Sequence, residues 1–160
     1  MSRKGPSKIR KILPDTQYQS EVVAKLINRS MFAGNKNAAQ KQVYEALKIF
    51  TKESKSKDTL ETLEQALENL KPKVEVRPRR IGGAVYQVPT PVRTSRQYSL
   101  AIRWLIIAAQ KRPNKQYHSF AEKLSAELLA VLNNEGAAIA KRQEVERMAE
   151  ANKAFSHLRW

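Results

Sequence analysis

The chain has 160 residues, of which 41% are apolar, and this is enough for one domain with its own hydrophobic core. Thirty lysines and arginines against fifteen acidic residues give a net charge of +15, so we expect the surface to bind phosphates or an anionic membrane. Cysteine is absent, which excludes disulfides and thiolate metal sites, and no apolar run is long enough to span a bilayer. The opening residues show no apolar stretch after their charges, and we expect no secretory signal.

The first half of the chain predicts a basic arm followed by helices. Residues 1–14 lack a hydrophobic period and indicate an extended arm, while residues 15–160 form the single domain. Ser20 caps the first helix, which Gly34 ends, and its apolar face is Val22, Val23, Leu26, Ile27 and Met31. The second helix repeats apolar residues at helical spacing: Ala39, Val43, Ala46, Leu47 and Phe50.

A third helix is predicted to open at Asp58, with Glu61 three residues later in a capping-box pattern. Its apolar stripe is Leu60, Leu63, Leu67 and Leu70, and Pro72 stops it. Residues 58–70 carry a charge of −4, so we expect this surface to face away from nucleic acid.

A two-stranded β-hairpin is predicted over residues 73–89. Residues 74–77 and 85–88 alternate in polarity as strands do, and Gly82 and Gly83 supply the positive φ of a tight turn. A proline in each strand forbids a central position in a sheet, so this should be a free ribbon. Because isolated hairpins are marginal in water, its tip should be mobile unless another molecule holds it.

Three helices are predicted after the hairpin. Thr94 and Gln97 suggest a capping box, and residues 100–109 are apolar on nearly all sides, which indicates a central buried helix. Ser119 and Glu122 open the next helix, whose inward residues are Phe120, Leu124, Leu128, Val131 and Leu132. The last runs from about residue 137 to 155, with one side formed by Ala138, Val145, Met148, Asn152 and Phe155.

The fold class expected is therefore mainly α: a six-helix domain with a protruding two-stranded β-hairpin and an extended basic N-terminal arm. No catalytic or metal site is visible. The only histidines, His118 and His157, are far apart and favour surface positions, while Asp15 and Asp58 suit a turn and a helix cap. No glycine-rich phosphate loop is present, and we expect neither an enzyme nor a cofactor.

Basic residues fall into three settings, each suited to phosphate. The arm offers Arg3, Lys4, Lys8, Arg10 and Lys11. The hairpin offers Arg77, Arg79 and Arg80 near its tip and Lys71 and Lys73 at its base. The helices offer a scattered set, of which about half should contact RNA: Lys25, Arg29, Lys36, Lys41, Arg93, Arg96, Arg103, Lys111, Arg112, Lys141, Arg142 and Arg147.

Several alternatives stay open at this point. The charge also suits a solvated, solubilising surface. Tyr86 can stack on a base or pack across the hairpin, and Arg103, in the most apolar helix, should reach the surface or pair with a carboxylate. A DNA-binding protein and an RNA-modifying enzyme compete with an RNA scaffold. The spread of charge over arm, ribbon and helices favours a large folded RNA.

Three blocks of sequence occur in order: residues 79–83 continuing to 86–89, residues 101–105 leading to 111–112, and residues 147–155 continuing to 157–160. With these blocks the chain resembles the family of small-subunit ribosomal protein seven, in its bacterial or organellar form, over essentially its whole length. Two departures are Asn35, where the family usually has a lysine, and Glu146, where it often has a histidine.

The resemblance implies a structural constituent of the small ribosomal subunit that binds the 3′ major domain of its RNA, nucleates assembly of the head and supports translation. The implied partners are exit-site tRNA, messenger RNA and neighbouring head and platform proteins, with no membrane and no homo-oligomer. The implied location is a cytoplasmic ribosome, or a plastid or mitochondrial one if organelle-encoded. Some bacterial members also repress their own messenger. The residues implied near tRNA and messenger are Arg79, Arg80, Gly82, Gly83, Arg142 and Arg147.

Overall fold

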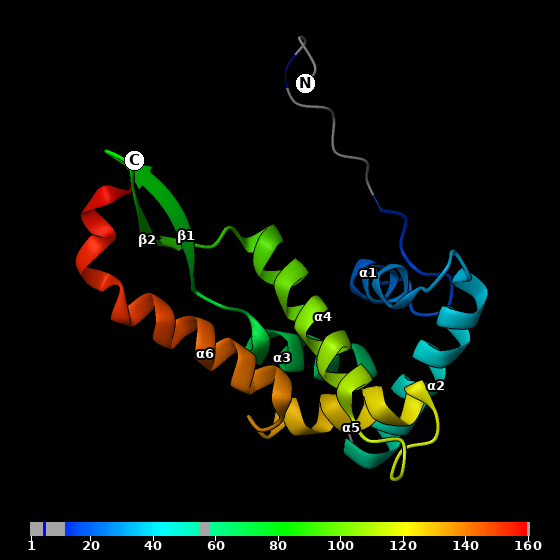
Figure 1. Cartoon of the computed structure of the whole chain (residues 1–160). Coiled ribbons are helices and arrows are strands. Elements are labelled where there is room, and N and C mark those ends of the chain that lie inside the picture. The colour runs from blue at the N-terminus through cyan, green and yellow to red at the C-terminus, as the bar shows by residue number, and fades with distance from the viewer. Residues whose placement is uncertain (1–4, 6–11, 55–57, 160) are drawn as a thin grey trace.

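The computed structural model describes residues 5, 12–54 and 58–159. Its elements are α1 (Glu21–Ser30), α2 (Lys36–Ser54), α3 (Thr59–Leu70), β1 (Val74–Ile81), β2 (Ala84–Pro91), α4 (Thr94–Lys111), α5 (Phe120–Leu132), α6 (Ala137–Ala151) and the 3₁₀ helix η1 (Lys153–Leu158) (Figure 1). A mainly helical fold with one antiparallel hairpin confirms the predicted fold class. The five basic residues predicted for the arm lie outside the described residues.

Side-chain caps open three of the helices, as the sequence predicts. Ser20 accepts the N–H of Val22 at 3.2 Å, Asp58 accepts that of Leu60 at 3.0 Å, and Ser119 accepts that of Glu122 at 3.2 Å. Each bond satisfies an N–H that has no partner within its own helix. The sequence therefore determines where α1, α3 and α5 begin.

The start of α4 differs from the prediction. Thr94 is the first helical residue rather than the cap, and Arg93 holds the cap position without a side-chain cap bond. The N–H of Val92 still donates to the carbonyl of Lys73 at 3.1 Å, which continues the hairpin ladder beyond β2. The chain therefore passes from strand to helix with no room for a separate capping turn.

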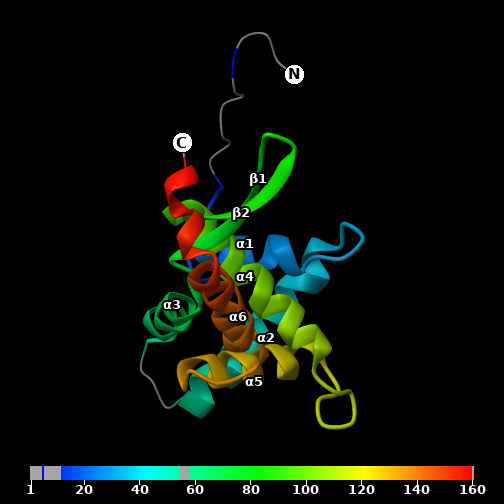
Figure 2. The ribbon, with the colours of Figure 1, turned by 60° about the vertical axis from the view of Figure 1, so that its left-hand side comes forward.

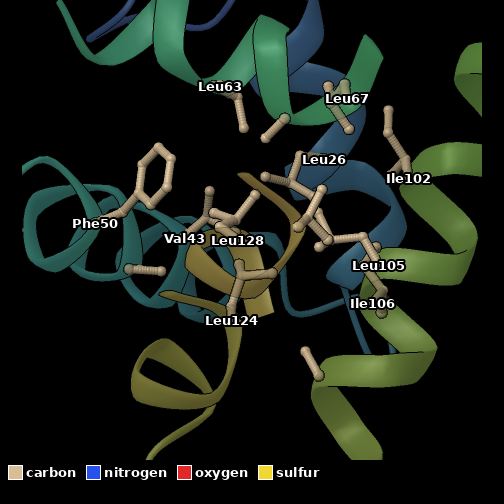
Figure 3. Close-up of a cluster of buried hydrophobic side chains, with 14 of the residues drawn as sticks. Leu26, Val43, Phe50, Leu63, Leu67, Ile102, Leu105, Ile106, Leu124 and Leu128 are labelled. Carbon is tan, nitrogen blue, oxygen red and sulfur yellow. The ribbon is translucent and has the colours of Figure 1, made fainter. Parts of the chain in front are cut away.

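Helix α5 lies at the centre of the hydrophobic core and contacts α2, α3, α4 and α6. Figure 3 shows Leu128 of α5 among side chains of the neighbouring helices, including Leu26, Phe50, Leu63 and Leu105, all at most 1% exposed. Burial of this apolar surface is the main source of stability for the helical domain.

The predicted central buried helix over residues 100–109 is confirmed for most of this stretch, but one side of it is open. The buried residues include Leu100, Ala101, Leu105 and Ala109, whereas Ile107 is 42% exposed and Arg103 is exposed as well. One apolar residue therefore lies on an open face beside a cation, and this face contributes to the site described below.

The hairpin is longer than the two predicted stretches, and its base is not free. Gly82 and Gly83 form the turn with φ of 56° and 92°. Val88, in the middle of β2, is fully buried, and the ring of Tyr86, closer to the turn, lies 5.3 Å from that of Phe155 in η1. Figure 2 shows that the turn end of the ribbon extends away from the helices. The hairpin thus consists of a packed base and a protruding tip.

Helix α6 ends at Ala151, earlier than predicted, and η1 follows it. Its buried residues are Ala138, Ile139 and Ala149, whereas Met148, assigned to the inner side by the sequence, is 43% exposed. Two of the three buried residues are alanines, so the positions of the large apolar side chains did not predict which face of α6 packs against the domain. None of the described helices is long and apolar enough to cross a membrane.

Candidate nucleic-acid interface

A groove of about 560 Å³ lies between α4 and α6. Trp104 and Ile107 contribute apolar surface to it. Four cations line it, two from each helix: Arg103, Lys111, Lys141 and Arg147. All four belong to the set that the sequence singled out, and the packing of α4 against α6 brings them together although up to 44 residues separate them along the chain.

Helical spacing explains why these side chains share one surface. Arg103, Ile107 and Lys111 are four residues apart along α4 and so lie on the same face. Arg103 is exposed, so of the two alternatives for this residue the structure places it at the surface. The open face of α4 and the facing side of α6 form the two walls.

The lining of the groove is strongly positive. Lys141 pairs with Glu144 at 2.8 Å, and Arg147 donates to the carbonyl of Gln143 at 3.3 Å. Among the described residues no carboxylate forms an ion pair with Arg103 or Lys111. Four cations therefore face a single acidic side chain, and the two on α4 are available to an anion from outside.

At the base of the hairpin two predicted RNA-binding arginines converge on one buried carboxylate. Glu75 is 7% exposed and accepts hydrogen bonds from Arg77 at 2.6 Å and Arg96 at 2.8 Å. Burial alone raises the pKa of Glu75, but these two arginines outweigh it and hold that pKa below its ordinary value. Because Arg96 lies in α4 and Glu75 in β1, their bond attaches the hairpin to α4.

The hairpin tip presents its cations differently. Arg80 is exposed, and no described carboxylate forms an ion pair with it. Arg79 is half-buried and lies opposite Tyr86 in the strand register. Tyr86 packs against Phe155 of η1, a contact that neither sequence alternative for this ring included.

Three of the predicted RNA-binding cations are engaged inside the molecule. Arg112 pairs with Glu127 at 2.7 Å, and Arg142 donates to the carbonyl of Asn69. Lys71 pairs with Glu68 and lies 3.3 Å from the centre of the Tyr98 ring. Their side chains are only 10–22% exposed, so these cations are less available to RNA than those of the groove.

The ammonium of Lys71 remains charged in this setting. Burial alone lowers the pKa of Lys71, but its hydrogen bonds with Glu68 and Tyr98 outweigh burial and raise that pKa above its ordinary value. The lysine is therefore charged at neutral pH and ties the end of α3 to α4.

The remaining predicted cations lie apart from the groove. Arg29 donates to the hydroxyl of Ser99 at 2.6 Å, which links α1 to α4, and Lys25 pairs with Glu21 at 3.5 Å. Four others are exposed: Lys36, Lys41, Lys73 and Arg93. Lys73 lines a second hollow of about 490 Å³ between the hairpin base and the C-terminal helices, with two cations that the predicted set omitted, Lys153 and Arg159.

Sequence reasoning also missed the apolar floor of the groove and one buried acid. Trp104 and Ile107 were read as core because they fall in an apolar run. Glu127 is 1% exposed, and its position three residues after Leu124, on the inward face of α5, was the available signal. Both histidines are exposed, as expected, and no cluster of potential metal ligands occurs within residues 12–54 and 58–159.

Cations that gather in a groove and at the tip of a hairpin form the pattern expected of a structural nucleic-acid-binding protein. Comparisons with known proteins identify the family. The family model of ribosomal protein S7p/S5e matches residues 2–153. The chain therefore belongs to the ribosomal protein S7p/S5e family, whose members are structural proteins and not enzymes.

Curated relatives match over the whole length. The small ribosomal subunit protein uS7 of Caldicellulosiruptor bescii is 53% identical over 160 residues, covering 100% of both chains. The uS7 protein of Stenotrophomonas maltophilia is 49% identical, again over 100% of both, and that of Thermosipho africanus is 50% identical over 99% of both. The resemblance drawn from the three sequence blocks is thereby confirmed.

Proposed function

We propose that this chain is a structural component of the small ribosomal subunit that binds the subunit's RNA through the α4–α6 groove and the hairpin tip. The observation that carries the proposal is the convergence of Arg103, Lys111, Lys141 and Arg147 on one groove. The names of its relatives support the setting, since each is a small ribosomal subunit protein.

The groove combines the two kinds of contact that RNA offers. Its cations neutralise phosphates, and arginine can bind a phosphate through two N–H groups at once. Trp104 and Ile107 provide apolar surface against which a base or ribose can pack, and stacking on aromatic rings suits unpaired nucleotides. Because no carboxylate among the described residues pairs with Arg103 or Lys111, these two carry most of the proposed phosphate binding.

The hairpin tip is the second proposed contact. Arg80, Gly82 and Gly83 lie beyond the packed part of the hairpin, and Arg79 borders it opposite Tyr86. These four residues form the part we assign to exit-site tRNA and messenger RNA. Arg147 of the groove belongs to the same assignment. Arg142 is a weaker candidate because its guanidinium already bonds the carbonyl of Asn69.

The wider role follows from the resemblance to ribosomal protein seven. Within it, the chain binds the 3′ major domain of the small-subunit RNA, nucleates head assembly and contacts head and platform proteins. It acts without a cofactor, membrane or homo-oligomer, in a cytoplasmic or organellar ribosome. Acidic α3, with Glu61, Glu64 and Glu68 exposed, is assigned to a side that faces away from RNA.

The test is binding to a transcript of the 3′ major domain, with duplex DNA of equal length as competitor. Arg103→Ala combined with Lys111→Ala should weaken binding at least tenfold, because two phosphate contacts are lost. Lys48→Ala, which removes an exposed lysine of α2, is the matched control and should leave affinity unchanged. Equal losses in both, or equally strong competition by DNA, would refute the groove as an RNA site.

A further inference from the structure

The carboxylate of Glu127, in α5, joins the ends of two other helices. One oxygen accepts a hydrogen bond from Nε of Arg112, the C-cap residue of α4, at 2.7 Å. The other accepts the backbone N–H of Ala138, in the first turn of α6, at 3.0 Å. A carboxylate beside a helix N-terminus also interacts favourably with the helix dipole. Glu127 thus bonds α4 and α6 at the same time.

Arg112 is oriented by further contacts. Its guanidinium donates to the hydroxyl of Tyr117 at 3.2 Å and to the carbonyl of Ala126 at 3.2 Å. A planar, forked cation with three fixed acceptors has little freedom to turn outward. This arrangement explains why a residue expected to bind RNA is instead four-fifths buried.

The turn between α5 and α6 is built around the same carboxylate. Gly136 has a φ of +94°, and a Cβ added there would lie 2.9 Å from Oε1 of Glu127 and 3.1 Å from Cβ of Ala130. The close approach lets the N-terminus of α6 reach the carboxylate. A side chain at this position would push the two apart.

The bonded residues adjoin the walls of the groove. Arg112 follows Lys111, and Ala138 follows Ala137, and both Lys111 and Ala137 line the groove. Burial of a carboxylate is costly unless its oxygens are bonded, so this arrangement resists rearrangement. The position of α4 relative to α6 at this end therefore depends on Glu127.

We propose that Glu127 and Arg112 are positioning residues that set the spacing of the α4–α6 groove and so its affinity for RNA, without contacting RNA themselves. The inference rests on the proposed function of the groove. Arg112, which the sequence predicted to bind RNA, is thereby assigned the role of positioning the groove.

The spacing is tested first, without RNA. Because the chain has no cysteine, Gln110→Cys and Gln143→Cys place a pair of spin labels on exposed sites of α4 and α6. Glu127→Gln should broaden the distance distribution between them, while a reference pair on α2 and α3, Lys48→Cys and Glu64→Cys, stays unchanged. An unchanged α4–α6 distribution in folded Glu127→Gln would overturn the inference, whether or not the groove binds RNA.

The link to binding is tested by a mutant cycle with the transcript. Glu127→Gln should lower affinity about tenfold, and Arg103→Ala with Lys111→Ala should then cost much less in the Glu127→Gln background than in the wild type. Arg80→Ala, at the hairpin tip, should cost the same in both backgrounds. Multiplicative losses throughout would show that Glu127 does not act through the groove. If Arg103 and Lys111 have no effect in the wild type, the proposed function of the groove fails, while the spin-label result stands separately.

Arg112→Lys is a second variant that controls for a folding defect in Glu127→Gln. It keeps a cation opposite Glu127 but loses the planar guanidinium that bonds several acceptors at once. It should reproduce the broadened distribution with normal circular dichroism. Failure of both Glu127→Gln and Arg112→Lys to fold would overturn the inference, because the pair would then hold the domain rather than the groove.

Discussion

Nε of Arg96, in α4, lies 2.8 Å from Oε2 of Glu75, in β1, and this pair between a half-exposed arginine and a buried carboxylate attaches the hairpin to the helical domain. Arg77 donates to the same carboxylate. With Val88 fully buried beside it, the base of the hairpin is part of the domain, while its tip is not.

Glu75→Gln should destabilise the domain or the docking of its hairpin by about 1–3 kcal/mol at neutral pH, because a buried charge-assisted contact is lost. The pKa of Glu75 is lowered in the folded state, so its contribution is present above the unfolded pKa, about 4.3, and is lost as the pH falls through the folded pKa. The difference in unfolding free energy between wild type and variant should therefore be constant from pH 6 to 8 and shrink below about pH 4.

Urea unfolding at a series of pH values, with amide exchange of the β1–β2 ladder, measures this difference. Glu144→Gln is the matched control: it removes the carboxylate of an exposed pair and should change stability by less than about 0.5 kcal/mol. A Glu75→Gln effect that does not depend on pH would contradict the role given to the ionised carboxylate.

Shortening the hairpin should leave the helical core intact. Deletion of residues 80–81 and 84–85 keeps the glycine turn and leaves Arg79 opposite Tyr86, as the present register has them. Because the removed residues lie beyond the packed base, the free energy of core unfolding should change by less than about 0.5 kcal/mol, while contact with tRNA or messenger weakens. Loss of the helical circular dichroism signal would show that the tip belongs to the core.

A buried and an exposed phenylalanine allow the energetic contribution of core packing to be measured. Phe50 is 0% exposed and Phe32 is 87% exposed. Phe50→Ala should cost about 3–5 kcal/mol of unfolding free energy through lost burial and the cavity left behind, whereas Phe32→Ala should cost less than about 0.5 kcal/mol. Chemical denaturation of both variants checks this, and comparable losses would contradict the core assigned to α2 and α5.

Two glycines with positive φ separate backbone strain from crowding. Gly34 has a φ of +80° and nothing within 4 Å of an added Cβ, whereas Gly136 meets Glu127 and Ala130. Alanine at Gly34 should cost about 1–2 kcal/mol through strain alone, and alanine at Gly136 should cost more because Glu127 must also move. Thermal unfolding ranks the two, and an equal cost would mean that the turn relaxes freely around Glu127.

Local signals made much of the fold predictable. Ser20, Asp58 and Ser119 mark helix starts because a cap acts on the residues that follow it, and Gly82 and Gly83 mark a turn that requires positive φ. The last helix was harder, because its packed side consists of Ala138, Ile139 and Ala149. Alanine contributes little to a hydrophobic pattern, although its small side chain lets two helices approach each other closely.

The site was predictable as a set of residues but not as an arrangement. Composition and spacing selected Arg103, Lys111 and Lys141, yet their meeting depends on how α4 packs against α6. The partners that remove Arg112 and Arg142 from the surface are 15 and 73 residues distant in sequence. No local pattern identifies such pairs, and a cation count therefore overstates the charge that RNA can reach.

The salt dependence of binding to the 3′ major domain transcript tests the central claim most directly. If phosphate neutralisation by the groove and hairpin dominates, the logarithm of affinity falls linearly with the logarithm of salt concentration, and contacts with 6–10 phosphates cost roughly 10³–10⁵ in affinity between 50 and 200 mM salt. Arg103→Ala with Lys111→Ala should then reduce the slope by about 2, and Lys48→Ala should not change it. An association that is insensitive to salt, or a slope that Arg103 and Lys111 do not affect, would contradict the account.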